Sequence, residues 1–192
     1  MADYTGFVEA AEAFVGLLRD NLTPEPIGNR ELISLCSPHE SENNQLSVFL
    51  YHIEEDPHNN QAGFFQYSKD IQQANPSNFH MTLLVTAHSK APSQLKEADQ
   101  YRMIGAVIQI VKDNPILDRK YISGSLLDSD DELHISVERA NFDHMMKIWN
   151  NTASPYKLSI VIRLESVTIE SKRTRTISRV GDVEISVDQK DV

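Results

Sequence analysis

The side chains that could hold a metal ion or act on a substrate are sparse in this 192-residue chain. His52, His80 and His88 lie in segments with strand-like alternation, and a bound metal would need three or four ligands to converge. Their spacing is uninformative, so surface or hydrogen-bonded histidines are the simpler interpretation. Cys36 precedes His39 by three positions and resembles half of a zinc site, but no matching half follows. We therefore expect no bound metal.

Motifs for phosphate binding and nucleophilic catalysis are also missing. The 7 glycines form neither G-x-G-x-x-G nor G-x-x-x-x-G-K-[ST]. Ser123 and Ser125 flank Gly124, but this segment lacks the strand-to-helix setting and the nearby histidine of a catalytic serine. The acidic run at residues 128–132 lacks the alternating order of a calcium-binding loop. We expect no catalytic residues and no cofactor, and a binding or structural protein rather than an enzyme.

One cluster of basic residues stands out against the acidic background. It consists of Lys172, Arg173, Arg175 and Arg179, and acidic residues dominate from Asp182 onward. Lysine and arginine on an edge strand can simply block unwanted strand pairing. The functional interpretation is a docking arm that adds a strand to a neighbouring subunit or forms ion pairs with it. These four residues are therefore the predicted partner-binding site.

Composition limits the class of protein and of partner. With 40% hydrophobic and 24% charged residues, the chain resembles an ordinary globular domain. Its net charge of −10 argues against binding to nucleic acid or to an anionic membrane. The single cysteine cannot form an intrachain disulfide, and no signal peptide or membrane-spanning run is evident, so we expect synthesis in the cytoplasm.

Hydrophobic periodicity predicts an α+β fold, with helices packed on a mixed, mainly antiparallel sheet. The predicted helices lie at residues 4–19 and 94–112, with a short third helix that has Asn141 as its N-cap. The predicted strands lie at residues 46–53, 79–88, 133–137 and 156–169, with a terminal strand at 183–187.

Three further expectations concern single segments of this fold. The phase of alternation slips at Glu165 and Ser166, which predicts a bulge in the strand at residues 156–169. Residues 54–77 are poorly patterned and predict a long exposed loop. Trp149, the single tryptophan, lies in the predicted short helix, and we expect its side chain in the protein core rather than on a binding surface.

The order of several sequence blocks resembles a known family. These blocks are LSVFLYHIEEDP at residues 46–57, LLVTAH at 83–88, DNPIL at 113–117, IWN at 148–150, YKLSI at 156–160 and VTIES at 167–171. Together they are similar to the cap, or tube and sheath terminator, proteins of phage-tail-like contractile injection systems. The resemblance implies a tail-terminator-like fold and carries no catalytic residues.

The resemblance also implies a function and a set of partners. Members of the family are expected to form a homohexameric ring that closes the end of the inner tube and sheath distal to the baseplate. The partners would be other copies of the chain, the inner tube protein and the sheath protein, within an assembled extracellular particle. We expect residues 1–171 to form the cap domain and residues 172–192 to form its arm. The competing hypothesis is an adaptor that binds one protein through the same basic arm.

Overall fold

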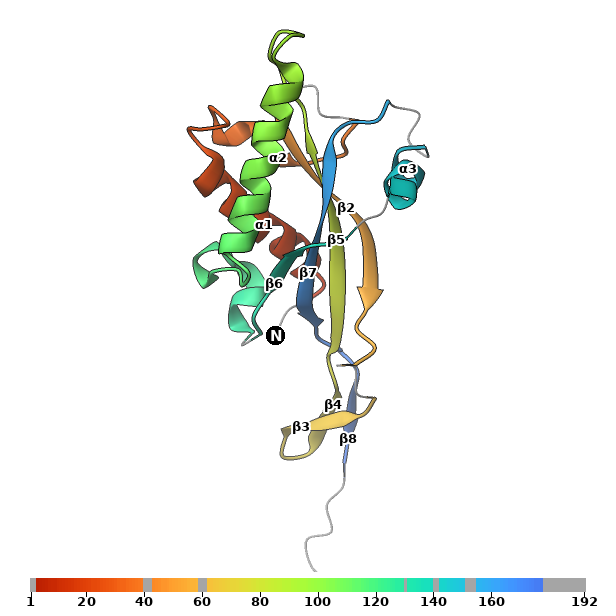
Figure 1. Cartoon of the computed structure of the whole chain (residues 1–192). Helices are drawn as coiled ribbons and strands as arrows, with labels where there is room; N and C mark the ends of the chain where they lie inside the picture. The colour runs from red at the N-terminus through yellow and green to blue at the C-terminus, as the bar shows by residue number, and fades with distance from the viewer. Residues whose placement is uncertain are drawn as a thin grey trace, which may run out of the picture.

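The computed structural model describes residues 3–39, 43–58, 62–129, 131–139, 142–150 and 155–177. The helices in this part of the chain are α1 (Gly6–Leu22), α2 (Lys96–Asp113) and α3 (Phe142–Asn150), joined by the short 3₁₀ helices Arg30–Leu32, Arg119–Tyr121 and Gly124–Asp128. The strands are β1 (Ile33–Leu35), β2 (Leu46–Glu55), β3 (Phe64–Ser68), β4 (Ile71–Ala74), β5 (Ser77–Ala87), β6 (His134–Val137), β7 (Ser159–Ile169) and β8 (Thr174–Thr176). Figure 1 shows how they are arranged.

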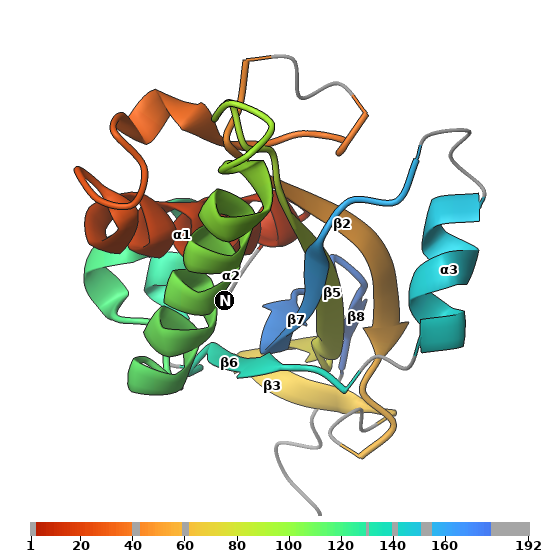
Figure 2. The ribbon, with the colours of Figure 1, turned by 45° about the horizontal axis from the view of Figure 1, so that its top comes forward.

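Five strands form a body sheet in the order β1-β2-β5-β7-β6. The β1–β2 pair is parallel, and the β2–β5, β5–β7 and β6–β7 pairs are antiparallel. Helices α1 and α2 lie on one face of this sheet and α3 lies on the other (Figure 2). The predicted α+β fold with a mixed, mainly antiparallel sheet is therefore confirmed.

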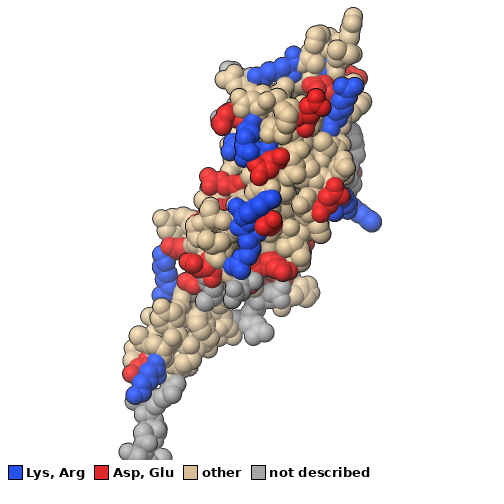
Figure 3. All heavy atoms as spheres, turned by 90° about the vertical axis from the view of Figure 1, so that its left-hand side faces the viewer, with Lys and Arg blue, Asp and Glu red and all other residues tan. Residues whose placement is uncertain are grey.

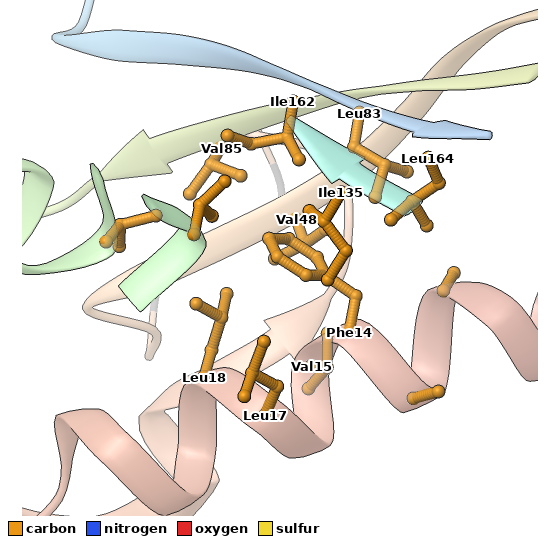
Figure 4. Close-up of a cluster of buried hydrophobic side chains, with 14 of the residues drawn as sticks. Phe14, Val15, Leu17, Leu18, Val48, Leu83, Val85, Ile135, Ile162 and Leu164 are labelled. Atoms are coloured by element: carbon orange, nitrogen blue, oxygen red, sulfur yellow. The ribbon is translucent and has the colours of Figure 1, made fainter. Parts of the chain in front are cut away.

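The alternation of side chains along β5 and β7 supplies two separate cores. Leu83 and Ile162 point toward α1, where Phe14 and Leu18 meet them in the main core (Figure 4). Leu84 of β5 and Val161 of β7 face the other way and form a smaller cluster with Met145 and Trp149 of α3. Trp149 is only 2% exposed, which confirms its predicted place in the core.

The predicted bulge in the long C-terminal strand is present. Phe79 and Met81 of β5 pair with Val167 and Leu164 of β7, so β7 holds one extra residue in this interval. Ser166 takes up the excess with a φ of 68°, in the left-handed region that non-glycine residues rarely occupy. Because of this extra residue, the side chains of the strand that pack in the main core lie at even-numbered positions before Ser166 and at odd-numbered positions after it.

The prediction of a loop across residues 54–77 is wrong. β2 continues to Glu55, and β3 and β4 form a hairpin inside the predicted loop. β8 pairs with β4, so these strands make a separate small sheet in the order β3-β4-β8. It projects beyond one end of the body (Figure 1). Its strands lack apolar alternation because most of their side chains face solvent on both sides.

Some expectations fall outside the part of the chain that the structure describes. These are the N-cap at Asn141, the terminal strand at residues 183–187 and the fourth basic residue of the predicted site, Arg179.

Candidate functional site

The basic arm forms part of the small sheet. Lys172 and Arg173 precede β8 and Arg175 lies within it, and all three side chains are exposed. The amide of Ala74 donates to the carbonyl of Arg173 at 2.9 Å, which extends the β4–β8 ladder. The structure thus places one of the four predicted site residues, Arg175, on a short edge strand and two more directly before it.

Lys172 links the start of the arm to the N-terminal segment. Its ammonium lies 3.0 Å from the carboxylate of Asp3 and 5.5 Å from the centre of the Tyr4 ring. A hydrogen bond from the Tyr4 amide, followed by the contact with Lys172, lowers the pKa of Asp3. Because both partners are exposed, this pair contributes little to stability. Its effect is to hold the arm beside the first residues of the described chain.

The two arginines pack against an aromatic ring of the hairpin. The guanidinium carbon of Arg175 lies 4.2 Å from the centre of the Phe64 ring, and that of Arg173 lies 5.4 Å from it. Arg175 also donates from Nε to the side-chain oxygen of Gln72 at 2.8 Å. Stacking uses the flat faces of the guanidinium groups and leaves terminal N–H donors for a carboxylate of a partner.

The small sheet has two edges in the part of the chain that is described, β3 and β8. Edge strands carry backbone donors and acceptors that can pair with an added strand. Exposed apolar side chains, Tyr67 at 65% and Ile71 at 38%, lie on the same hairpin. The combination of open edges, apolar side chains and guanidinium groups suits an extended protein segment as a ligand.

A second charged cluster, which sequence patterns did not predict, lies on the face of the body sheet that also carries α3. Arg163 is 2.6 Å from a carboxylate oxygen of Glu54, 2.9 Å from Glu165 and 4.0 Å from Glu138. One guanidinium thus faces three carboxylates, one on its own strand β7, one on β2 and one directly after β6. The sequence pattern shows only that these side chains lie on the polar side of their strands. The register between the strands was needed to bring them together.

The body also carries an apolar groove of about 550 Å³ between the start of α1 and the neighbouring strands β1 and β2. Tyr4, Val8, Leu35 and Phe49 line it and are exposed. None of the described residues that line the groove is charged, whereas basic and acidic side chains are interleaved on the side of the molecule that Figure 3 shows.

The three histidines considered above do not share a site. His52 lies 3.9 Å from Glu54, His80 lies 3.8 Å from Asp56, and His88 contacts Ser47 at 2.8 Å. Within the described residues, no group of three or more histidine, cysteine or acidic side chains is placed to hold a metal ion.

Ser125 has a structural role. Its hydroxyl and the amide of Leu126 both donate to the carboxylate of Glu9 at 2.9 Å, which fixes this turn against α1. Gly124 has a φ of 66°, and a Cβ atom there would lie 2.5 Å from the Glu9 carboxyl group. Only glycine satisfies both the backbone conformation and this close approach.

Comparison with known proteins decides the family. A family model described as the Pvc16 N-terminal domain matches residues 9–181. The chain belongs to this family. The Pvc16 N-terminal domain match includes both sheets and the described part of the arm, so the small sheet is part of the family region. A search of curated proteins finds no match.

Solved structures show the same fold. The PVC sheath/tube terminator of an extracellular contractile injection system, in its extended state, has a TM-score of 0.65 and 17% identity. That match covers 100% of this chain and 66% of the other. The anti-feeding prophage cap, described as a tube terminating cap, has a TM-score of 0.59 and 17% identity, with 94% and 61% coverage. The chain thus spans somewhat less than two thirds of the length of these chains.

None of the helices in the described ranges is long and apolar enough to cross a membrane.

Proposed function

We propose that the chain is a structural, non-enzymatic cap that terminates the inner tube and sheath of a phage-tail-like contractile injection system. The observation that carries this proposal is the likeness, over the whole chain, to a protein described as a sheath/tube terminator. Membership of the Pvc16 N-terminal domain family supports it independently of that fold comparison. The cap would act at the end of the particle distal to the baseplate, and the particle would be extracellular.

We propose further that six copies form a closed ring. A cyclic ring needs two different complementary faces on each subunit. The apolar groove beside β2 offers one uncharged face that a neighbouring copy would cover. A stiff body sheet with α1 and α2 packed against it would keep the ring geometry fixed.

The arm, residues 172–192, would make the second kind of contact. Its described part ends at the tip of the β3–β4 hairpin, where the amide of Ile177 donates to the carbonyl of Asp70 at 3.0 Å. The small sheet therefore presents the basic side chains at the far end of the molecule. We place the sheath protein, or the next cap subunit, against this end.

Electron microscopy of particles from a strain that lacks this gene, beside the unmodified strain and a complemented one, tests the proposal. The expected result is tubes or sheaths of uncontrolled length, or particles without a distal cap, with restoration on complementation. Labelling of the chain in complemented particles should mark the end opposite the baseplate. Normally capped particles in the deletion strain would contradict the capping role, and a label along the sheath or at the baseplate would contradict its position.

A further inference from the structure

A cavity lined by basic side chains lies at the end of the body where β5 ends and α2 begins. Its volume is about 280 Å³. The positively charged or titratable side chains that line it, called the lysine pocket below, are His39, His88, Lys90, Lys96 and Lys157. The other lining residues are Asn44, Ala87, Ser89 and Gln100, so none of the described residues that line the cavity is acidic. This concentration of basic groups is notable in a chain of net charge −10.

The side chain of Lys157 is fixed in the lysine pocket by two contacts. Its ammonium donates to the carbonyl of Pro38 at 3.0 Å and lies 3.2 Å from Nδ1 of His88. Nε2 of His88 lies 2.8 Å from the hydroxyl of Ser47. These contacts assign a neutral His88 that accepts from Lys157 at Nδ1 and donates to Ser47 at Nε2. Two of the three donors of Lys157 are used in this way, and within the described residues the third has no acceptor.

The basic groups of the pocket oppose each other's charge. Burial, followed by Lys157 and His39, lowers the pKa of His88 to about 4. Burial and the nearby Lys96 lower the pKa of Lys157. An anion in the cavity would offset this repulsion because it favours the protonated form of each neighbour.

The first turn of α2 brings charges of both signs close to the pocket. Lys96 is the first residue of α2, so the partial positive charge of the helix N-terminus lies beside it. The first-turn carboxylate of Asp99 accepts a hydrogen bond from the hydroxyl of Ser89. Glu97 is exposed in the same turn. Lys90 donates to the carbonyl of Asn43 at 2.8 Å, which holds its ammonium at the rim.

We propose that the lysine pocket binds an oxyanion, either the carboxylate of an acidic side chain on a protein partner or a free phosphate. Lysine ammonium groups bind such oxygens as point charges, without the fixed fork of arginine. The site lies at the opposite end of the long axis of the molecule from the small sheet (Figure 1). It is therefore separate from the arm, and it would bind anions whether or not the chain is a cap.

Titration of the intact chain with inorganic phosphate tests the pocket, with the imidazole resonances of His88 followed by NMR. A parallel titration with chloride at equal ionic strength corrects for general screening. The expected result is a saturable shift and a rise in the pKa of His88 with phosphate alone. A short peptide rich in glutamate forms a second arm of the experiment. Binding of the peptide but not of phosphate assigns the ligand to a protein carboxylate, and the reverse assigns it to free phosphate.

The Lys96→Glu variant should weaken binding of whichever ligand responds, phosphate or the peptide, by about tenfold or more. The reason is that a charged hydrogen-bonding group is lost and its charge is reversed. Lys112→Glu is the matched control, since it makes the same change in an exposed residue at the other end of α2. It should leave the affinity within about twofold. Circular dichroism establishes that both variants fold, and Lys90→Glu replaces Lys96→Glu if the latter does not. The absence of a saturable response to either ligand, or equal weakening by Lys112→Glu, would overturn the proposal.

Discussion

The body sheet and the small sheet have the same kind of hydrogen-bonded ladder but very different surroundings. In the body, residues Met81 to Ala87 of β5 are all buried between the helices on the two faces. In the small sheet, all three residues of β8 and three of the five in β3 are exposed. Backbone pairing is therefore common to both sheets, whereas packing is confined to the body.

If the small sheet binds a partner as we propose, this difference separates the part of the molecule that provides stability from the part that provides assembly contacts. Burial of apolar side chains is the main favourable contribution to folding, and the small sheet has little of it. A sheet of three short strands without a packed face is only marginally stable in water. The arginine stacks on Phe64 and the strand ladder support it, and an added strand or a bound partner would stabilise it further. Four changes test this division.

The largest expected effect is on stability, from a cavity in the body. Phe14→Ala removes a fully buried ring from the main core and should lower the free energy of unfolding by about 3–5 kcal/mol. Phe64→Ala makes the same change in the half-buried ring of the small sheet and should cost less than about 1 kcal/mol. Urea unfolding of the two variants gives both values. Similar losses of unfolding free energy in the two variants would mean that the small sheet is packed as tightly as the body and unfolds together with it.

The next effect is on assembly, from charge reversal of the arm. Arg173→Glu, Arg175→Glu and Arg179→Glu together should reduce incorporation into particles by about tenfold or more, since they would place like charges against the acidic partner surface that we propose. The free energy of unfolding should change by less than about 0.5 kcal/mol per substitution, because the two described arginines are exposed.

Counting of capped particles by electron microscopy measures incorporation. The control replaces Arg102 and Lys112, both exposed on α2, with glutamate and should assemble normally. If the arm variant is incorporated as efficiently as the unmodified chain, the arm has no role in assembly.

A smaller effect is a pH dependence of stability that arises in the body alone. The pKa of His88 is about 4 in the folded chain and has an ordinary value of 6.5. Between these values the unfolded state binds a proton that the folded state does not, so stability is complete above pH 6.5 and falls as the pH drops toward 4. After allowance for solvent screening of this half-buried ring, the loss is about 1–2 kcal/mol.

Thermal unfolding across this range measures the slope, and His88→Asn should flatten it. A slope that persists unchanged in the variant would assign the pH dependence to other groups.

The smallest effect concerns the bulge in β7, near the end of the body that faces the small sheet. Ser166→Gly should raise the free energy of unfolding by about 0.5 kcal/mol, because relief of the left-handed conformation slightly exceeds the entropic cost of glycine. Ser166→Val should lower it, since a β-branched residue is strained at this φ. Chemical denaturation of both variants provides the comparison, and stabilisation by valine would rule out strain at this position.

Most elements of the body follow from short-range patterns in the sequence, although the short strand β1 was not predicted. Residues at three- and four-residue steps predicted α1 and α2, and alternation predicted β2, β5, β6 and β7. Even the slip in phase at Ser166 was visible, because each extra residue moves the apolar side chains to the other parity. The β3–β4 hairpin could not be predicted from these patterns, since strands exposed to solvent need no apolar periodicity.

The sequence by itself thus determined the α+β class, the two faces of the main strands and the basic character of the arm. Only the tertiary structure decided which polar groups meet. Lys157 reaches His88 across 69 positions, Lys172 reaches Asp3 across 169, and Arg163 meets Glu54 through the register of β5 between their strands. Periodicity specifies the face on which a side chain lies, but strand order and register select its neighbours, and these depend on packing throughout the molecule.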